Sequence, residues 1–296
     1  MNIRSISPSL GAEVTGFDVN SIGTAEALDE VKRHLFEHQL LVFRDQRLEP
    51  GDLERFTLRF GDPDPHVLTQ FALSGHPDIF VISNIVRDGK PLGSRSEGFG
   101  WHTDLIYFAQ PASYTILYAL EVPEEGGDTL FASLYRAYDE LPEAERQRLR
   151  RLRARHSYTH MYDKRPGAEP LTPEQRARTP DVLHPMVRRH PETAREGLYI
   201  NRETVAGIDG LNVEESKALI GQLFDFALQD RFRYAHKWRA GDLVIWDNRG
   251  LLHCATPYDM DKHRRLLYRM SVRGEVPIAA NELAQSASPN QRALHG

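Results

Sequence analysis

Cysteine is almost absent from the sequence of 296 residues, in which Cys254 is the single instance. One thiol cannot form a disulfide within the chain, which is typical of a reducing compartment, and thiolate zinc clusters are excluded. Long apolar runs are absent as well, because no run reaches about 18 residues and no signal-like stretch stands near the start. The sequence therefore predicts a cytoplasmic protein without a membrane partner, in which only histidine and carboxylate side chains can bind a metal.

Positive charge is not in excess, since 37 basic and 42 acidic residues give a net charge of −5. No global field is available to bind nucleic acid or an anionic membrane, so an anionic ligand must be bound locally. The hydrophobic content of 40% excludes a disordered chain. The basic segment 146–155 spaces Leu149 and Leu152 as a helix does, which favours an amphipathic helix with a solvated basic face over a nucleic-acid site.

Mixed periodicity along the chain predicts an α+β fold. Helices are predicted where Thr24 precedes Leu28, Val31 and Leu35, where Leu53, Phe56 and Phe60 repeat that spacing, and where Asn212 and Glu215 precede Leu219, Leu223 and Phe226. Strands are predicted at residues 39–43, 79–82, 115–119, 129–131, 198–200, 231–238, 243–246 and 265–273. These short strands favour a sandwich or barrel, with the third helix packed on the outside of the sheet.

Two segments are predicted to add little to the core. Residues 163–181 contain four prolines, Pro166, Pro170, Pro173 and Pro180, and few large apolar residues, so we expect a long loop that could act as a lid. Residues 286–296 are polar and without pattern, which predicts a flexible tail. We find no internal repeat.

The segment Trp101-His102-Thr103-Asp104 places an imidazole and a carboxylate two residues apart. In extended backbone these two side chains leave the same face and can bind one ion, although such a pair alone is typical of a surface or core contact. His253 follows the apolar run GDLVIWDNRGLL and is the candidate third ligand. Two histidines and a carboxylate on one face are typical of non-haem Fe(II) oxygenases, because they leave metal positions open. The other histidines except His66 are predicted to be structural or on the surface.

Two arginines share one face of the predicted strand 265–273. Alternation places Arg265, Leu267 and Arg269 on one side, opposite Leu266, Tyr268 and Met270. A buried guanidinium is unfavourable unless it meets an anion, so we expect either anionic ligands or structural salt bridges to Asp or Glu. The residues alone leave both interpretations open.

Several motifs occur in a characteristic order. They are LGAEVTGFDV near residue 10, LLVFRDQ, LRFGDP, His102-x-Asp104, Gly126-Gly127-Asp128-Thr129, Trp246-Asp247-Asn248-Arg249, His253 and Arg265. In these motifs the sequence resembles the Fe(II)/2-oxoglutarate-dependent dioxygenases of the taurine dioxygenase and 2,4-dichlorophenoxyacetate dioxygenase family. The resemblance covers nearly the whole chain. It implies a double-stranded β-helix, also called a jelly-roll or cupin-like barrel, with flanking helices, and a single catalytic domain over residues 1–296.

The resemblance also implies roles for individual residues. His102, Asp104 and His253 would bind Fe(II), and Thr129 and Arg265 would bind the distal carboxylate of 2-oxoglutarate. Arg269 matches the arginine that faces the metal-side carboxylate or an anionic substrate group. O2 would be the second co-substrate, and succinate and CO2 would be released as the substrate C–H bond is hydroxylated.

The resemblance limits the substrate. His66 falls where the taurine enzymes have a substrate-contacting histidine, but Thr69 and Gly98 replace their tyrosine and asparagine, which disfavours taurine. Tyr107 could line an apolar pocket. We expect a small anionic substrate, an aryloxyalkanoate or another carboxylate ahead of a sulfonate or alkyl sulfate. We also expect no nucleic-acid partner and a homo-oligomer, either a dimer or a tetramer.

Two other functions use the same residues. A non-catalytic cupin-like protein could bind a metal or a small acid, although the complete ligand set argues against it. A zinc-dependent hydrolase could use the same ligands, but Arg265 and Thr129 would then have no evident task.

Overall fold

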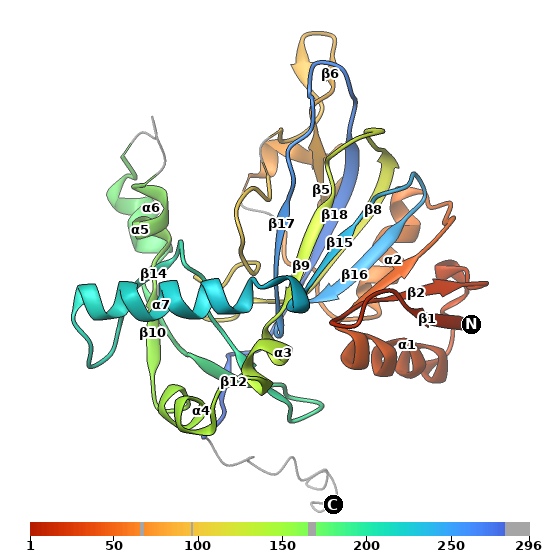
Figure 1. Ribbon diagram of the computed structural model, residues 1–296. Helices are drawn as coiled ribbons and strands as arrows, with labels where there is room; N and C mark the ends of the chain where they lie inside the picture. The colour runs from red at the N-terminus through yellow and green to blue at the C-terminus, as the bar shows by residue number, and fades with distance from the viewer. Residues whose placement is uncertain (66–67, 96, 165–169, 282–296) are drawn as a thin grey trace, which may run out of the picture.

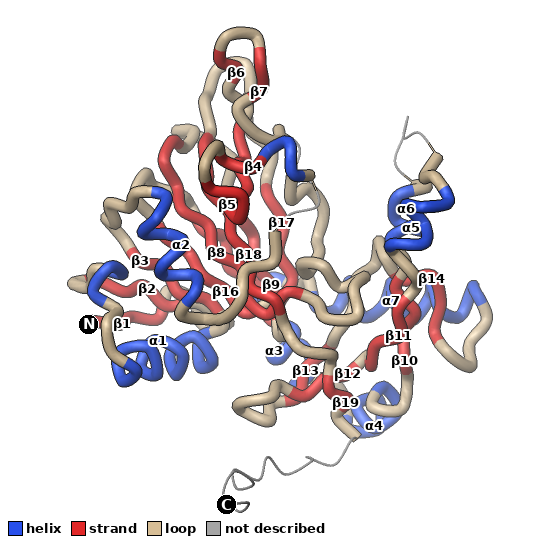
Figure 2. Tube along the Cα trace, turned by 180° about the vertical axis from the view of Figure 1, so that it is seen from behind, coloured by secondary structure: helices blue, strands red, loops and turns tan. Residues whose placement is uncertain are grey.

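The computed structural model describes residues 1–65, 68–95, 97–164 and 170–281, which form a large sheet, several small sheets and surrounding helices (Figures 1 and 2). The large sheet has the order β1 (Asn2–Ser5), β2 (Ala12–Thr15), β3 (Leu40–Phe43), β16 (Leu243–Asp247), β8 (Ala112–Glu121), β18 (Leu266–Arg273), β5 (His76–Ser83) and β4 (Ala72–Leu73). Only the β2–β3 pair is parallel in this sheet. None of the sheets seen in these ranges closes on itself, and the α+β content agrees with the prediction.

Four smaller sheets complete the strand content of these ranges. They are β15 (Arg233–His236), β9 (Thr129–Ser133) and β17 (Leu251–Ala255); β11 (Val182–Pro185), β10 (Arg153–His156) and β14 (Val205–Ile208); β13 (Glu196–Leu198), β12 (Val187–Arg189) and β19 (Ile278–Ala279); and the hairpin β6 (Val86–Arg87) and β7 (Lys90–Pro91). The first of these, β15-β9-β17, carries two residues that the sequence analysis singles out, Thr129 and His253.

The helices lie on both sides of the large sheet. They are α1 (Ala25–His38), α2 (Pro50–Leu58), α3 (Leu134–Asp139), α4 (Glu143–Leu149), α5 (Tyr158–Tyr162), α6 (Pro173–Arg178) and α7 (Val213–Ala227), with 3-10 turns at Val19–Ser21, Thr69–Phe71 and Asp230–Phe232. Figures 1 and 2 show α1 and α2 on one side of the molecule and α4 to α7 on the other. No helix of the described ranges is long and apolar enough to span a bilayer.

The three predicted helices are present. Thr24 caps α1 by accepting from the amide of Ala27, and Val31 and Leu35 are fully buried. Asn212 and Glu215 form the predicted capping box of α7. The apolar side of α7 packs on β14 and α3, so the sheet that it covers is the small β11-β10-β14 sheet.

The prediction of a helix over residues 146–155 is wrong at its C-terminal end. Helix α4 stops at Leu149, and Arg153–His156 forms β10. Ala154 and His156 are buried and alternate with exposed arginines, which is the periodicity of a strand, and β10 pairs with both β11 and β14. Sheet pairing therefore overrides the helical spacing of the leucines.

The loop predicted at residues 163–181 is also partly wrong, because it contains α6. Thr172 and Gln175 form a capping box and Pro173 occupies the first turn, where proline is tolerated. Residues 165–169 and the tail at 286–296 lie outside the described residues.

Most predicted strands are found with shifted ends. The segment predicted at 231–238 begins with a 3-10 turn, so β15 covers only Arg233–His236. Of the strand predicted at 198–200, only Leu198 lies in a strand, at the end of β13. Tyr199 and Ile200 are nevertheless buried. Burial explains the apolar character of these two residues without strand pairing.

The large sheet has an apolar core on each face. Tyr268, Met270 and Val272 of β18 join the core beneath α1 and α2. Leu267 belongs to the core on the opposite face of the large sheet. That core also contains Phe131 of β9 and further residues of the large sheet, such as Leu117 and Trp246. The predicted alternation is therefore confirmed from Leu267 to Val272, and it places Arg269 on the side that faces the small β15-β9-β17 sheet. Arg265 lies one residue before β18, and the pairing register shifts between Leu266 and Leu267.

Candidate active site

His102 and His253 are brought together by backbone pairing. The amide of His102 donates to the carbonyl of His253 at 2.9 Å, and the amide of His253 donates to the carbonyl of His102 at 2.8 Å. This antiparallel bridge places residues 100–104 against β17. Two segments separated by 150 residues in sequence thus meet at one point.

Asp104 completes a cluster of three possible metal ligands. Its Oδ1 lies 3.6 Å from Nε2 of His102, and its Oδ2 lies 3.6 Å from Nε2 of His253. One ligand atom from each of the three residues lies within 4.8 Å of the other two. Asp104 and His253 are buried, and His102 is half-buried. The structure therefore brings the three predicted residues together as a His-Asp-His group.

Hydrogen bonds orient the Asp104 carboxylate and the His102 ring. Thr115 Oγ1 donates to Asp104 Oδ2 at 2.6 Å, and Asn248 Nδ2 donates to Thr115 Oγ1 at 2.9 Å. The indole of Trp246 donates in turn to Asn248 Oδ1 at 2.9 Å. Nδ1 of His102 donates to the carbonyl of Gly100 at 2.8 Å, which leaves Nε2 unprotonated in the neutral ring. The metal-ligand atoms of Asp104 and His102 are thus held in position before any metal binds.

Charge around the cluster favours an ionised Asp104. Burial alone would raise the pKa of this carboxyl, but Arg269 and the two histidines outweigh it and hold the pKa well below its usual range. Arg269 Nη2 lies 2.8 Å from Asp104 Oδ1. Burial also lowers the pKa of His253 to about 3, so its ring is neutral near pH 7. An anionic carboxylate and neutral imidazoles are the protonation states that metal binding needs.

Asp247 and Arg249 hold the turn between β16 and β17. Arg249 donates to Oδ1 of Asp247 at 2.8 Å and to Oδ2 at 2.7 Å, and both side chains are buried. Burial would raise the pKa of Asp247, but Arg249 and His190 lower it. Arg249 also donates to Tyr114 Oη at 2.6 Å. This buried pair fixes the turn that leads to His253.

Arg265 is buried without a carboxylate partner. Its residue is 5% exposed, its Nε has no hydrogen-bond partner, and the described part of the chain offers it no carboxylate within 4.0 Å. Burial lowers the pKa of Arg265 to about 10, so the guanidinium stays charged near pH 7. The sequence left open whether Arg265 and Arg269 form structural salt bridges or bind anionic ligands. Arg269 forms a salt bridge, with Asp104, and Arg265 forms none within the described ranges.

A small cavity of about 40 Å³ connects Arg265 with the cluster. Its lining includes Thr129, His102, His253 and Arg269. Thr129 Oγ1 accepts a hydrogen bond from the indole of Trp238 at 3.0 Å, which leaves the threonine hydroxyl proton available to an anion in the cavity. The sequence analysis did not single out Trp238.

A larger cavity of about 630 Å³ also borders the cluster, at His102 and Asp104. Its lining includes Tyr107, as predicted, together with Tyr158, Met161 and Tyr162 of α5, and the ring centroids of Tyr107 and Tyr158 are 5.0 Å apart. Arg269 lines both cavities. The sequence analysis did not identify these α5 residues, because a short segment that contains aromatic residues carries no recognisable binding motif. The predicted His66 lies outside the described residues.

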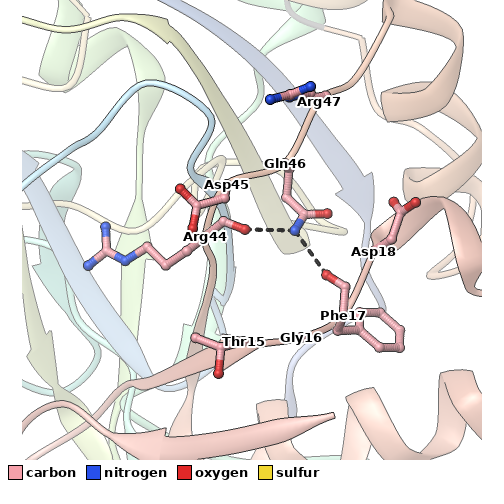
Figure 3. Close-up of a pocket in the computed structure, with 8 residues that line it drawn as sticks. All are labelled: Thr15, Gly16, Phe17, Asp18, Arg44, Asp45, Gln46 and Arg47. Carbon is pink, nitrogen blue, oxygen red and sulfur yellow. Dashed lines mark hydrogen bonds between the residues drawn. The ribbon is translucent and has the colours of Figure 1, made fainter.

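A separate pocket of about 380 Å³ lies between the segments that follow β2 and β3 (Figure 3). Gln46 Nε2 donates to the carbonyl of Phe17 on the other segment at 2.9 Å and to the carbonyl of Arg44 on its own segment at 2.8 Å. None of the predicted site residues lines this pocket.

Comparison with known proteins agrees with the geometry. Residues 2–271 match the model of the family described as taurine catabolism dioxygenase TauD, TfdA family. The chain is 35% identical to the (S)-phenoxypropionate/alpha-ketoglutarate-dioxygenase of Sphingobium herbicidovorans, over 96% of this chain and 98% of that protein. It is 34% identical to pentalenolactone F synthase of Streptomyces avermitilis, over 90% of this chain and 92% of that protein. The crystal structure of AAD-2 in complex with Mn(II) and N-oxalylglycine superposes with a TM-score of 0.77 at 28% identity, over 93% and 98% of the two chains.

Proposed function

Because the chain belongs to the TauD, TfdA family and is an alpha-ketoglutarate-dependent dioxygenase, we propose that it hydroxylates a C–H bond of a small anionic organic substrate. Alpha-ketoglutarate is 2-oxoglutarate, and succinate and CO2 would be its products. The observation that carries the proposal is the convergence of His102, Asp104 and His253 beside a buried Arg265 that forms no ion pair within the described ranges.

The donor set fits a ferrous ion. Two imidazole nitrogens and one carboxylate oxygen, each held by a hydrogen bond or by burial, suit Fe(II) and leave positions for other ligands. When bound, the iron would supply the activation of O2 that side chains cannot perform. His102, Asp104 and His253 would hold the ion, and Thr115 would keep the carboxylate in place.

The small cavity fits one end of 2-oxoglutarate. Arg265, whose Nε has no hydrogen-bond partner, and Thr129 both line it, so a carboxylate placed there would satisfy a buried cation. We assign the distal carboxylate of 2-oxoglutarate to these two residues. Arg269 would neutralise charge between the two cavities, on Asp104 and on the carboxylate nearest the metal.

The larger cavity fits a substrate bigger than taurine. Aromatic and thioether groups of Tyr107, Tyr158 and Met161 favour an apolar body, and Arg269, which also lines the cavity, favours an anionic group. We therefore propose an aryl or similarly bulky carboxylate ahead of a sulfonate or alkyl sulfate. The related phenoxypropionate enzyme acts on an acid of this kind, as its name says. His66 remains a predicted substrate contact.

We also propose that the large sheet and the β15-β9-β17 sheet form the two walls of a double-stranded β-helix. Phe131 and Leu251 of the small sheet share one core with Leu117, Trp246 and Leu267 of the large sheet, which supports this arrangement. Ala132 of β9 joins the core of α3, α7 and the small sheets, which supports a single catalytic domain. Assembly into a dimer or tetramer stays a prediction that light scattering can test.

Anaerobic titration tests the proposal directly. Addition of Fe(II) and 2-oxoglutarate to the pure protein should give a weak visible charge-transfer band. His102→Ala should lose both iron and the band, because a metal ligand is removed. If no band develops with the intact protein, the assignment of the metal and 2-oxoglutarate sites is wrong. Turnover with Zn(II) but not Fe(II) would instead favour the hydrolase, and a substrate screen without succinate formation would favour a binding protein.

A further inference from the structure

The last turn of α1 carries a second group of potential metal ligands, His34, Glu37 and His38. Helix α1 lies beside β1 and β2 and contributes none of the residues that line the two cavities of the active site (Figure 1). We propose that these three residues bind one borderline divalent transition-metal ion, of the class of Zn²⁺, Ni²⁺ or Cu²⁺. This inference does not depend on the proposed function.

The helix places the three donors on one side. Residues three and four apart are neighbours on a helical surface, so His34 faces both Glu37 and His38. Nδ1 of His34 lies 3.7 Å from Oε2 of Glu37, and Nε2 of His38 lies 3.9 Å from the same oxygen. Ligands about 2.0–2.2 Å from a tetrahedral zinc ion lie roughly 3.3–3.6 Å apart. The ligand atoms of the three residues all lie within 4.8 Å of one another, so metal binding requires small side-chain movements, and Glu37 is exposed and can make one.

Two further observations are compatible with a cation. Nδ1 of His34 is buried, has no hydrogen-bond partner and is the nitrogen that faces Glu37, so it is free to bind a metal once its proton moves to Nε2. The group also lies at the C-terminal end of a helix of 14 residues, where the helix dipole is negative and favours a bound cation. The bound ion would cross-link the three side chains at the C-terminal end of α1. Gln39, which follows directly, has a left-handed backbone and leads into β3.

Arg33 competes with the metal. Its Nη2 lies 3.0 Å from Nε2 of His34, so that nitrogen accepts a hydrogen bond and Nδ1 carries the proton. Metal binding at Nδ1 moves the proton to Nε2, where it would oppose the N–H of Arg33. Because Arg33 is exposed, it can turn into solvent. Removal of Arg33 should therefore strengthen metal binding.

Metal titration of a variant without the active-site group tests the proposal. In His102→Ala/Asp104→Ala protein, competition with a chromophoric chelator should find one Zn²⁺ equivalent, and His34→Gln or His38→Gln should weaken its binding at least about tenfold. Arg33→Ala should bind more tightly, and Cu²⁺ should bind more tightly than Zn²⁺ and Mn²⁺ more weakly. His76→Gln is the matched control, because His76 pairs with Glu54 at 2.9 Å without a second histidine.

Unchanged Zn²⁺ affinity in both His34→Gln and His38→Gln would overturn the proposal, and so would the absence of the equivalent from the background variant. If that variant does not fold, the intact protein serves, where the same substitutions should lower the bound zinc from two equivalents to one. Loss of both equivalents in His34→Gln would also contradict an independent site on α1.

Discussion

Arg265 and Arg269 line the same small cavity but meet different partners. Arg269 is paired with Asp104 at 2.8 Å, whereas the buried Arg265 has an Nε without a hydrogen-bond partner and forms no ion pair within the described ranges, although Glu97 lines the same cavity. A guanidinium held in this state is unfavourable until an anion arrives. The cavity that connects Arg265 with the His-Asp-His group shows where a dicarboxylate would gain most from binding.

We expect Arg265→Ala to raise the KM for 2-oxoglutarate about 10–100-fold while the protein still binds iron, because hydrogen bonds to a charged group contribute roughly 1.5–3 kcal/mol. Succinate formation at increasing 2-oxoglutarate concentration measures the KM, and an iron titration measures metal retention. Arg264→Ala is the matched control, since Arg264 is exposed and pairs with Glu121 at 3.1 Å. A normal KM in Arg265→Ala, or loss of iron, would contradict the assigned role.

Thr115 links the Asp104 carboxylate to Asn248 and Trp246. Thr115→Val keeps the shape of the side chain but leaves Asp104 Oδ2 without its donor. We expect iron affinity to fall about 10–100-fold, as for other groups that orient metal ligands. Thr57 is a buried threonine of α2 whose hydroxyl donates to the carbonyl of Leu53, so Thr57→Val should leave iron affinity unchanged. Equal iron affinity in the two variants would show that Thr115 does not orient the ligand.

Secondary structure was predictable where local signals and tertiary contacts agree. The caps Thr24 and Asn212 begin the expected helices, and the alternation of β18 follows from its sequence. Residues 153–156 show the opposite case, because pairing with β11 and β14 converts the end of a helical pattern into a strand. Residues 172–178 contain a capping box that can be recognised in the sequence, but the four prolines of the segment led to the prediction of a loop.

The candidate site was predictable as a set of donors but not as a shape. The His-x-Asp and His253 pattern identified three residues that do meet. The wall formed by Tyr158, Met161 and Tyr162 depends on how α5 packs, which no local spacing encodes. The ion pair of Arg269 with Asp104 likewise depends on contact between residues 165 positions apart in sequence.

Two glycines in different elements provide a matched pair of stability predictions. Gly221 lies inside α7, where a Cβ would meet nothing within 4 Å, so Gly221→Ala should stabilise the protein by about 0.5–1 kcal/mol. Gly250 precedes β17, and a Cβ there would clash with Cε2 of the ring of the buried Tyr135. Gly250→Ala should destabilise by about 1–3 kcal/mol or more. Urea unfolding measures both free energies, and a neutral Gly250→Ala would show that Tyr135 can move.

Several buried titratable groups couple the folded state to pH. His156 and His184 lie in the small β11-β10-β14 sheet, and burial lowers their pKa values to about 3 and about 4. The pKa values of Asp104 and Asp247 are also lowered, despite burial, by their arginine partners. These two kinds of group lose their stabilising effect over different pH ranges. The carboxylates keep theirs above about pH 4 and lose it as the pH falls further.

The histidines act first when the solution is acidified. In the unfolded chain each takes up a proton as the pH falls through about 6.5, whereas the folded protein resists protonation until about pH 4. At these two histidines the unfolded state then binds up to two more protons, so they should lower the free energy of unfolding by roughly 2.7 kcal/mol per pH unit between about pH 6 and pH 4, and His253, with a pKa of about 3, adds to this slope. Urea unfolding of the metal-free protein at several pH values measures this slope.

His156→Gln removes one of the two protons from this balance and should reduce the slope by about 1.4 kcal/mol per pH unit, whatever its effect on stability at pH 7. His156 is fully enclosed and contacts Thr204 through Nδ1 at 2.8 Å, so glutamine can keep a polar contact in its place. A slope that is the same in His156→Gln and in the unsubstituted protein would mean that His156 takes up its proton without unfolding. The small sheet would then open locally to water before the rest of the protein unfolds.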